Sequence, residues 1–171
     1  KAVLEPRDGR YLISIGSKIY VFSYFPSSKV SAWSIYEPGF VVDRWAYDGL
    51  QTLCRSGNKI YSLGGENGNT YDSCEVVVQM PFLDSSSPAT FKQYHSIDVT
   101  CDNTWTVSIS TDPQDITLRE EVATVFQTTY GLGRAAITGY STHLAPRLVC
   151  TNAGSAKLGN IAIHYDGGEA G

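Results

Sequence analysis

Charged residues are scarce in this chain of 171 residues, and no run of Lys or Arg occurs in it. Asp, Glu, Lys and Arg make up 18% of the sequence, whereas soluble domains average roughly 25%. The formal net charge is −4. A tight nucleic-acid binder needs a basic patch, so the composition argues against sequence-specific DNA recognition. It leaves open a surface along which DNA passes without adhering, because a mildly acidic wall does not hold DNA.

Long apolar runs and paired cysteines are also missing. The apolar stretches cover only a few residues, far short of the about 20 that a membrane-spanning helix needs, so we expect no membrane anchor. The cysteines Cys54, Cys74, Cys101 and Cys150 form no Cys-x-x-Cys pair, which argues against a zinc ribbon. Each lies in or beside a strand-like segment, so we expect buried free thiols, with disulfides as the open alternative.

Motifs that carry catalysis are lacking too. The sequence has no Gly-x-Ser-x-Gly elbow and no phosphate-binding loop. Residues 131–136, Gly-Leu-Gly-Arg-Ala-Ala, fit a loose dinucleotide pattern but lack the surrounding βαβ unit, and a turn explains them. His95, His143 and His164 show no metal-ligand spacing. We therefore expect a protein that is not an enzyme and that uses no metal or cofactor.

Aromatic residues, by contrast, are abundant. The chain contains eleven Tyr, three Trp and six Phe, residues that favour strands and contacts between proteins. Residues 18–24 and 30–36 are rich in β-branched and aromatic residues and flank a Pro-Ser-Ser turn, which predicts a hairpin. Residues 50–55 and 59–63 flank Ser-Gly-Asn, which predicts a second hairpin.

The texture of the sequence changes at a Pro- and Ser-rich segment, residues 80–88, which we interpret as a linker. Beyond it, Trp105, Val107 and Ile109 alternate with polar residues, as in a strand with one buried face. Residues 116–127 fit either a short helix or a strand, and strand is favoured. We predict an all-β chain, with β-propeller-like blades in residues 1–92 and a small antiparallel β-sandwich in residues 93–171.

The propeller expectation depends on repeated features. Lys-Ile-Tyr opens a strand-like segment at Lys18 and again at Lys59. Residues 58–72, which contain a Gly-Gly pair followed by an aromatic residue, resemble a kelch-type blade. Several such blades, repeating at about 50 residues, are needed to build a propeller.

Three further segments resemble the tail nozzle proteins of short-tailed bacteriophages, the tail tubular protein B type. They are Glu-Pro-Arg-Asp-Gly-Arg-Tyr at residues 5–11, Ile-Tyr-Val-Phe-Ser-Tyr-Phe-Pro at 19–26 and Lys-Val-Ser-Ala-Trp-Ser at 29–34. The resemblance covers roughly residues 5–92. Proteins of that family are several times longer, so it implies a C-terminal portion or a reduced relative.

The resemblance implies a non-enzymatic virion structural protein. Copies of it, six to a ring, would surround the DNA exit channel, contact other tail or portal-adaptor proteins, and retain or conduct packaged DNA without sequence preference. Its location would be the tail of the virion, after assembly in the host cytoplasm. No catalytic residues follow from the resemblance.

Specific side chains are candidates for the subunit interface. Tyr24 and Tyr36 are predicted to point outward, whereas Trp33 and Trp45 are predicted to fill the core. The isolated charges Arg7, Arg10 and Lys29 are further candidates, for contact with DNA or with a neighbouring subunit.

Two other functions stay open. One is a β-rich protein- or carbohydrate-binding module used in host attachment. The other is a glycosidase, for which Asp98 and Asp102 near Trp105 would supply the carboxylates.

Overall fold

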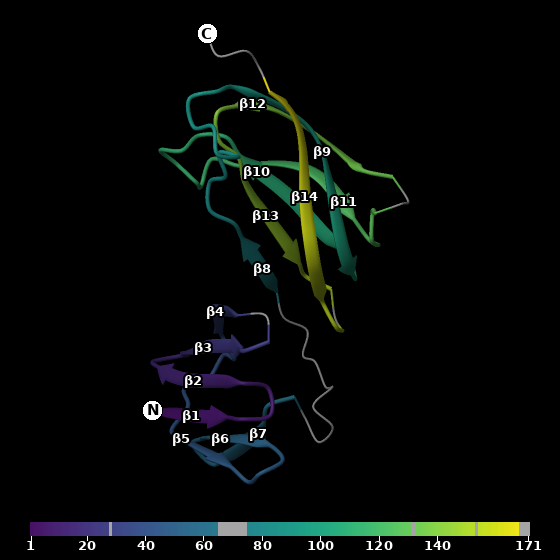
Figure 1. The fold of residues 1–171 in the computed structure, drawn as a ribbon. Coiled ribbons are helices and arrows are strands. Elements are labelled where there is room, and N and C mark those ends of the chain that lie inside the picture. Colours follow the sequence, from purple (N-terminus) through teal and green to yellow (C-terminus); the bar gives the residue numbers. More distant parts are fainter. Residues whose placement is uncertain (28, 65–74, 131–132, 153, 168–171) are drawn as a thin grey trace. The chain divides into compact units, whose positions relative to one another are not determined.

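The computed structural model describes residues 1–27, 29–64, 75–130, 133–152 and 154–167. Its regular elements are fourteen β-strands in antiparallel sheets (Figure 1), so the all-β prediction is confirmed. In these ranges no helix occurs, and hence none that could cross a membrane. The backbone contacts divide the chain into two compact units, Lys1–Tyr71 and Asp72–Gly171.

The first unit contains two small sheets. Four consecutive strands form a meander in the order β1-β2-β3-β4, and three more form the sheet β5-β6-β7. The strands are β1 (Ala2–Glu5), β2 (Arg10–Ile15), β3 (Lys18–Phe25), β4 (Val30–Tyr36), β5 (Arg44–Tyr47), β6 (Thr52–Ser56) and β7 (Lys59–Ser62). The pairing of β3 with β4 and of β6 with β7 confirms both predicted hairpins.

One small core joins the two sheets of the first unit. Leu12 of β2 and Ile19 and Val21 of β3 form one cluster with Val42, which precedes β5, and with Cys54 of β6. All five are at most 3% exposed. Alternation along β2 and β3 places these side chains on one face of the meander.

The second unit contains two further sheets, with strand orders β11-β10-β13-β8 and β12-β9-β14. Their strands are β8 (Val76–Gln79), β9 (Lys92–Asp102), β10 (Trp105–Ser110), β11 (Glu120–Val125), β12 (Ala135–Ser141), β13 (Ala145–Cys150) and β14 (Lys157–Gly167). The strand expected at residues 104–110 is therefore present, and the ambiguous segment 116–127 contains a strand.

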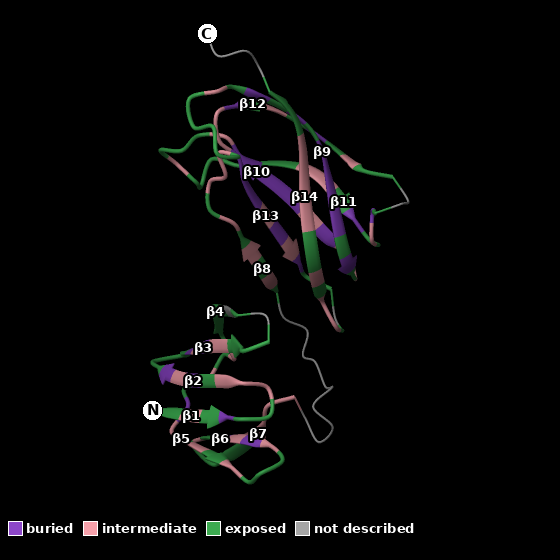
Figure 2. Cartoon of the chain, viewed as in Figure 1, coloured by how far each residue is buried: buried purple, intermediate pink, exposed green. Residues whose placement is uncertain are grey.

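A single core lies between these two sheets. Ile97 and Val99 of β9 pack in one cluster with Trp105 and Val107 of β10 and with Leu148 of β13. All five are at most 1% exposed, and Figure 2 colours the same stretches as buried. Because side chains of both sheets fill one core, the unit has two layers.

The units divide upstream of the boundary expected near residue 92, because the segment before β9 packs with the second unit. β8 pairs with β13, and Leu83 forms a bridge with Leu144. The buried ammonium of Lys92 donates to the carbonyls of Ser87 and Thr90 at 2.7 and 2.9 Å. The Pro- and Ser-rich composition of this segment thus indicates turns and not detachment from the sheets.

Candidate functional site

The outer face of the β1–β4 sheet is apolar from one edge to the other. Antiparallel partners point to the same side of a sheet, and the register places Leu4, Tyr11, Phe22 and Trp33 side by side across the four strands. A second row contains Ala2, Ile13, Tyr20 and Ile35. We call these two rows the aromatic face.

The aromatic face is open to solvent in the first unit. Leu4 is 60% exposed, Tyr11 41%, Trp33 61% and Ile35 51%. With about 150–250 Å² for each large aromatic side chain, these four residues leave on the order of 400 Å² of apolar surface open. The largest apolar patch on a typical monomer is about 300–600 Å² and is often functional.

The aromatic side chains also stiffen one another. The rings of Phe22 and Trp33 lie 5.0 Å apart between centroids and are tilted by 44°. Such tilted pairs are a favourable geometry for aromatic rings. The face therefore presents a preformed surface, which lowers the entropy cost of ordering its side chains when a partner binds.

The structure corrects one aromatic prediction and confirms another. Trp33 was expected in the core, but its strand partner is Phe22, which points away from the core, so Trp33 lies on the open face. Trp45 was also expected in the core; it packs against the core cluster, and its Nε1 donates to Ser14 Oγ at 3.2 Å.

The two predicted interface tyrosines are both accessible. Tyr24 is 49% exposed and Tyr36 is 38% exposed. They lie on opposite faces of the sheet, because Tyr24 follows Phe22 by two positions along β3 whereas Tyr36 pairs with Ile19 on the core side. Their role at an interface stays a prediction.

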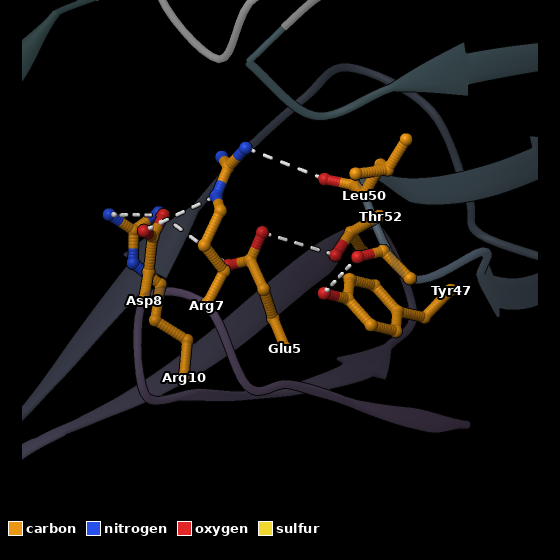
Figure 3. Close-up of polar contacts among 8 residues, drawn as sticks. Glu5, Arg7, Asp8, Arg10, Tyr47, Leu50 and Thr52 are labelled. Carbon is orange, nitrogen blue, oxygen red and sulfur yellow. Dashed lines mark hydrogen bonds and ion pairs between the residues drawn. The ribbon is translucent and has the colours of Figure 1, made fainter.

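The predicted basic residues Arg7 and Arg10 are engaged within the first unit (Figure 3). Arg10 reaches Asp8 at 3.5 Å and the buried Glu5 at 3.9 Å. Arg7 lies 3.6 Å from Asp8 and donates to the carbonyl of Leu50 at 3.4 Å. Lys29 has a positive φ of 54° and closes the turn before β4. Arg7 thus ties the β1–β2 turn to the β5–β6 loop, whereas Arg10 pairs within the β1–β2 hairpin. Any contact of either with DNA or a neighbour stays a prediction.

Glu5 anchors this arrangement. It is 4% exposed, and its Oε1 accepts a hydrogen bond from Thr52 Oγ1 at 3.2 Å (Figure 3). A buried carboxylate needs such partners to offset its desolvation. The segment 5–11 therefore has a structural reason for its acid–base pattern.

A second polar cluster surrounds Asp98 on β9, which is 6% exposed. Its Oδ1 accepts from Thr129 Oγ1 at 2.9 Å, and its Oδ2 lies 2.8 Å from His164 Nε2 and 3.4 Å from Arg134 Nε. Asp102 instead pairs with Lys157 at 3.3 Å. The two carboxylates proposed for glycoside hydrolysis thus hold different partners, and Asp98 binds Thr129 and Arg134 to the sheet.

The pairing of β9 with β14 also brings two histidines together. The rings of His95 and His164 are stacked with centroids 6.5 Å apart, a proximity that their sequence positions did not indicate. Among the described residues, no group of three or more His, Cys, Asp or Glu side chains could hold a metal ion.

Three of the cysteines are buried free thiols, as predicted: Cys54, Cys101 and Cys150. Burial raises the pKa of the Cys54 and Cys101 thiols, so they stay protonated and unreactive at neutral pH. Several residues named in the sequence analysis lie outside the described residues: Cys74, residues 65–72 of the kelch-like segment, and Gly131 and Leu132 of the loose dinucleotide pattern.

The sequence matches no protein-family model. No curated protein is significantly similar to it.

Sequence reasoning missed most of the aromatic face. It singled out neither Leu4 nor Tyr11, because their neighbourhood depends on the register of β1 and β2. A signal was present within β3, where Tyr20 and Phe22 alternate with the equally apolar Ile19 and Val21. A strand that is apolar on both faces predicts that both faces are covered.

Proposed function

We propose that the chain is a non-enzymatic virion structural protein, a subunit of a tail nozzle ring that surrounds the DNA exit channel and retains or conducts packaged DNA. The observation that carries the proposal is the uncovered aromatic face. The three segments that resemble nozzle proteins form the β1–β2 turn, β3 and β4, so the resemblance and the open face belong to one sheet.

The proposal includes a propeller-like first unit and a sandwich-like second unit. A meander of four antiparallel strands is the unit of a propeller blade, and β1–β4 has that strand order. The two-layered second unit corresponds to the sandwich-like module expected toward the C-terminus. Together they would form a propeller-like part followed by a terminal sandwich.

Association through the aromatic face is energetically reasonable. Burying on the order of 400 Å² of apolar surface contributes roughly 10 kcal/mol at 25 cal/mol per Å². Loss of translational and rotational freedom offsets a large part of that. Copies of the chain, six to a ring, and tail or portal-adaptor proteins are the partners that we propose, with the low charge limiting adhesion of passing DNA.

The test is the mass and shape of the purified chain, alone and mixed with the portal-adaptor protein of a short-tailed phage. Light scattering and electron microscopy should show rings in one of these samples. Trp33→Lys should abolish them, because it places a charge on the aromatic face. Leu118→Lys is the matched control, since Leu118 is 60% exposed but lies in the second unit. A chain that forms no ring in either sample would contradict the nozzle function.

A binding module for host attachment is the alternative, and one observation favours it. Phe91 and Tyr140 stack with centroids 5.0 Å apart and planes 17° apart, and they are 49% and 64% exposed. A groove of about 350 Å³ beside them is lined by Tyr140, Thr138, Arg119 and Glu120. Aromatic surface next to mixed polar groups suits a neutral saccharide. A glycan-binding screen in which Tyr140→Ala loses signal would support this alternative.

A further inference from the structure

Strand β4 is an edge strand that carries none of the features that prevent pairing with another strand. It lies at the end of the β1-β2-β3-β4 sheet, opposite β1 (Figure 1). Its seven residues, Val-Ser-Ala-Trp-Ser-Ile-Tyr, include no charge, Pro or Gly. The side chains from Ser31 to Tyr36 are all exposed. A long, apolar, uncharged edge is a template for pairing with another strand.

The other sheet edges in the described ranges carry the devices that prevent such pairing. β1, β5, β7 and β8 have only four residues each. β11 begins with two glutamates, and β14 carries Lys157 and Asp166. β12 is uncharged but has a bulge between Ala136 and Gly139. Short length, charge and bulges each block edge-to-edge pairing, so the exposed edge of β4 stands apart.

The backbone of β4 has its free side turned outward. The N–H of Tyr24 donates to the carbonyl of Gly9 at 3.0 Å, so the backbone groups of Tyr24 face β2 and not β4. Its partner Ser31 therefore has its own N–H and carbonyl directed away from β3, since these groups alternate along an antiparallel ladder. Because the direction of these groups repeats every two residues along a strand, the backbone N–H and carbonyl groups of Trp33 and Ile35 also point away from β3.

We propose that β4 is the site where a second copy of this chain extends the sheet, by antiparallel pairing of β4 with β4 of the partner across a two-fold axis near Trp33. This inference rests on the proposed function insofar as it takes the chain to act by assembly. It deepens that function by naming one contact between two subunits, and a ring of six needs a heterologous contact besides this two-fold one.

The absence of charge favours a second copy over other occupants. In a two-fold contact each residue meets the same patch of its partner, so a charge on the axis would face an equal charge. β4 has none. The charged residues that flank it, Lys29 and Glu37, have opposite signs, and Glu37 pairs with Lys18 at 2.9 Å.

Side-chain pairing favours the same contact. Pairing of β4 with β4 continues the row Leu4-Tyr11-Phe22-Trp33 into the partner's row, where two Trp33 rings lie opposite each other as a cross-strand aromatic pair. The aromatic face stays open in this contact and extends across both subunits.

Light scattering of the full chain over a wide concentration range tests the pairing, with three variants. Ser31→Pro removes an N–H that points at the partner and leaves the β3–β4 ladder intact. Ser31→Ala keeps that N–H and is the matched control. Trp33→Lys places two like charges opposite each other. Circular dichroism verifies that each variant is folded.

The wild-type chain and Ser31→Ala are expected to form a dimer, or a larger species built of dimers. Ser31→Pro should weaken that association at least tenfold while keeping the wild-type spectrum, and Trp33→Lys should do the same by charge repulsion if Ser31→Pro does not fold. A wild-type chain that stays monomeric at every concentration overturns the inference, and so does association that neither variant weakens.

These outcomes are separable from those of the nozzle proposal. A ring that persists in Ser31→Pro but is lost in Trp33→Lys overturns edge pairing and leaves the nozzle function standing. A dimer that is sensitive to Ser31→Pro, but that forms no ring with or without adaptor, supports edge pairing and contradicts the nozzle function.

Discussion

At the residue scale, the β1–β2 turn depends on Gly9. Its φ is +62°, and a Cβ at this position would lie 2.7 Å from the backbone oxygen of Tyr24. Gly16 has a similar φ of +58° but open space around it. Substitution of Gly16 by Ala therefore costs only the left-handed backbone conformation, whereas substitution of Gly9 adds the steric clash with Tyr24.

We expect Gly9→Ala to lower the free energy of unfolding by about 2–4 kcal/mol, of which about 1–2 kcal/mol is the left-handed conformation and the rest backbone displacement. Gly16→Ala should cost only the conformational part. Urea denaturation of both variants gives the comparison. Equal losses in the two would show that the contact with Tyr24 relaxes without cost.

Tyr94 carries a buried hydroxyl that has no hydrogen-bond partner among the described residues. The side chain is 2% exposed, and its Oη makes no hydrogen bond to the part of the chain that the structure describes. An unsatisfied buried polar group costs about 1–3 kcal/mol. Tyr94→Phe should therefore leave the free energy of unfolding unchanged or raise it by about 1 kcal/mol, as measured by thermal unfolding near pH 7. A loss above that size would reveal a hidden partner.

The same residue links stability to pH. Burial, with the nearby Tyr165 and Asp84, raises the pKa of Tyr94 above its ordinary value of 10.0. Because the pKa is higher in the folded state, the contribution of the neutral Tyr94 hydroxyl to the free energy of unfolding is complete below pH 10. It is lost as the pH rises through the folded-state pKa. Wild-type stability should thus fall more steeply above pH 10 than that of Tyr94→Phe. Parallel curves for the two proteins would contradict this.

Residue identity alone did not separate Trp33 from Trp45. Both lie in strand-like segments of similar composition, and both were expected in the core. The register of β3 and β4 places Trp33 on the open side, whereas β5 carries Trp45 against the core cluster. The partner strand, which is a long-range property, decided which face each indole takes.

At the element scale, Lys92 fastens the segment before β9. It is 1% exposed, and its ammonium donates to the carbonyls of Ser87, Thr90 and Thr142 at 2.7–3.0 Å. A lysine has three N–H donors, so each has an acceptor. This is how a buried cation is accommodated in the second unit.

Lys92→Met should lower the free energy of unfolding by about 2–4 kcal/mol, because three carbonyls lose a charged donor. It should also expose the 84–90 turn to protease. Lys157→Met is the control; its side chain is 71% exposed and pairs with Asp102, so a change within about 1 kcal/mol is expected. Denaturation and limited proteolysis measure both. Protection of the turn in Lys92→Met would contradict the clamp.

The strands themselves were largely predictable. Alternation at Trp105, Val107 and Ile109 predicted β10, and the turn residues predicted the two hairpins of the first unit. The assignment of β8 to the second unit was not predictable, because its pairing with β13 joins segments far apart in the sequence. Local composition at residues 80–88 indicated a linker where the structure has turns fastened by Lys92.

At the scale of the whole molecule, the two units have cores of different size. Among the described residues, the core cluster of the second unit contains twelve buried side chains and that of the first unit five. Stability grows with the apolar area buried, and small units are marginal on their own. The first unit thus has reason to gain stability from association through its aromatic face.

We expect the second unit to be the more stable. In hydrogen exchange measured by mass spectrometry, amides of β9, β10 and β13 should exchange more slowly than those of β2 and β3 under conditions that keep the chain monomeric. A polypeptide of residues 72–171 should fold alone, with the near-ultraviolet signal of buried Trp105. Uniform exchange across both units would show instead that they unfold as one.

The amino-acid sequence by itself determined the all-β class, the positions of most strands and turns, the burial of three cysteines and the low charge, because these follow from local periodicity and side-chain chemistry. Tertiary structure alone decided the boundary between the units, the cluster around Asp98 and the open aromatic face that ends at the exposed edge of β4. Each of these depends on which strand lies beside which, and in what register. Strand pairing joins residues that are distant in the chain, so no local pattern specifies it.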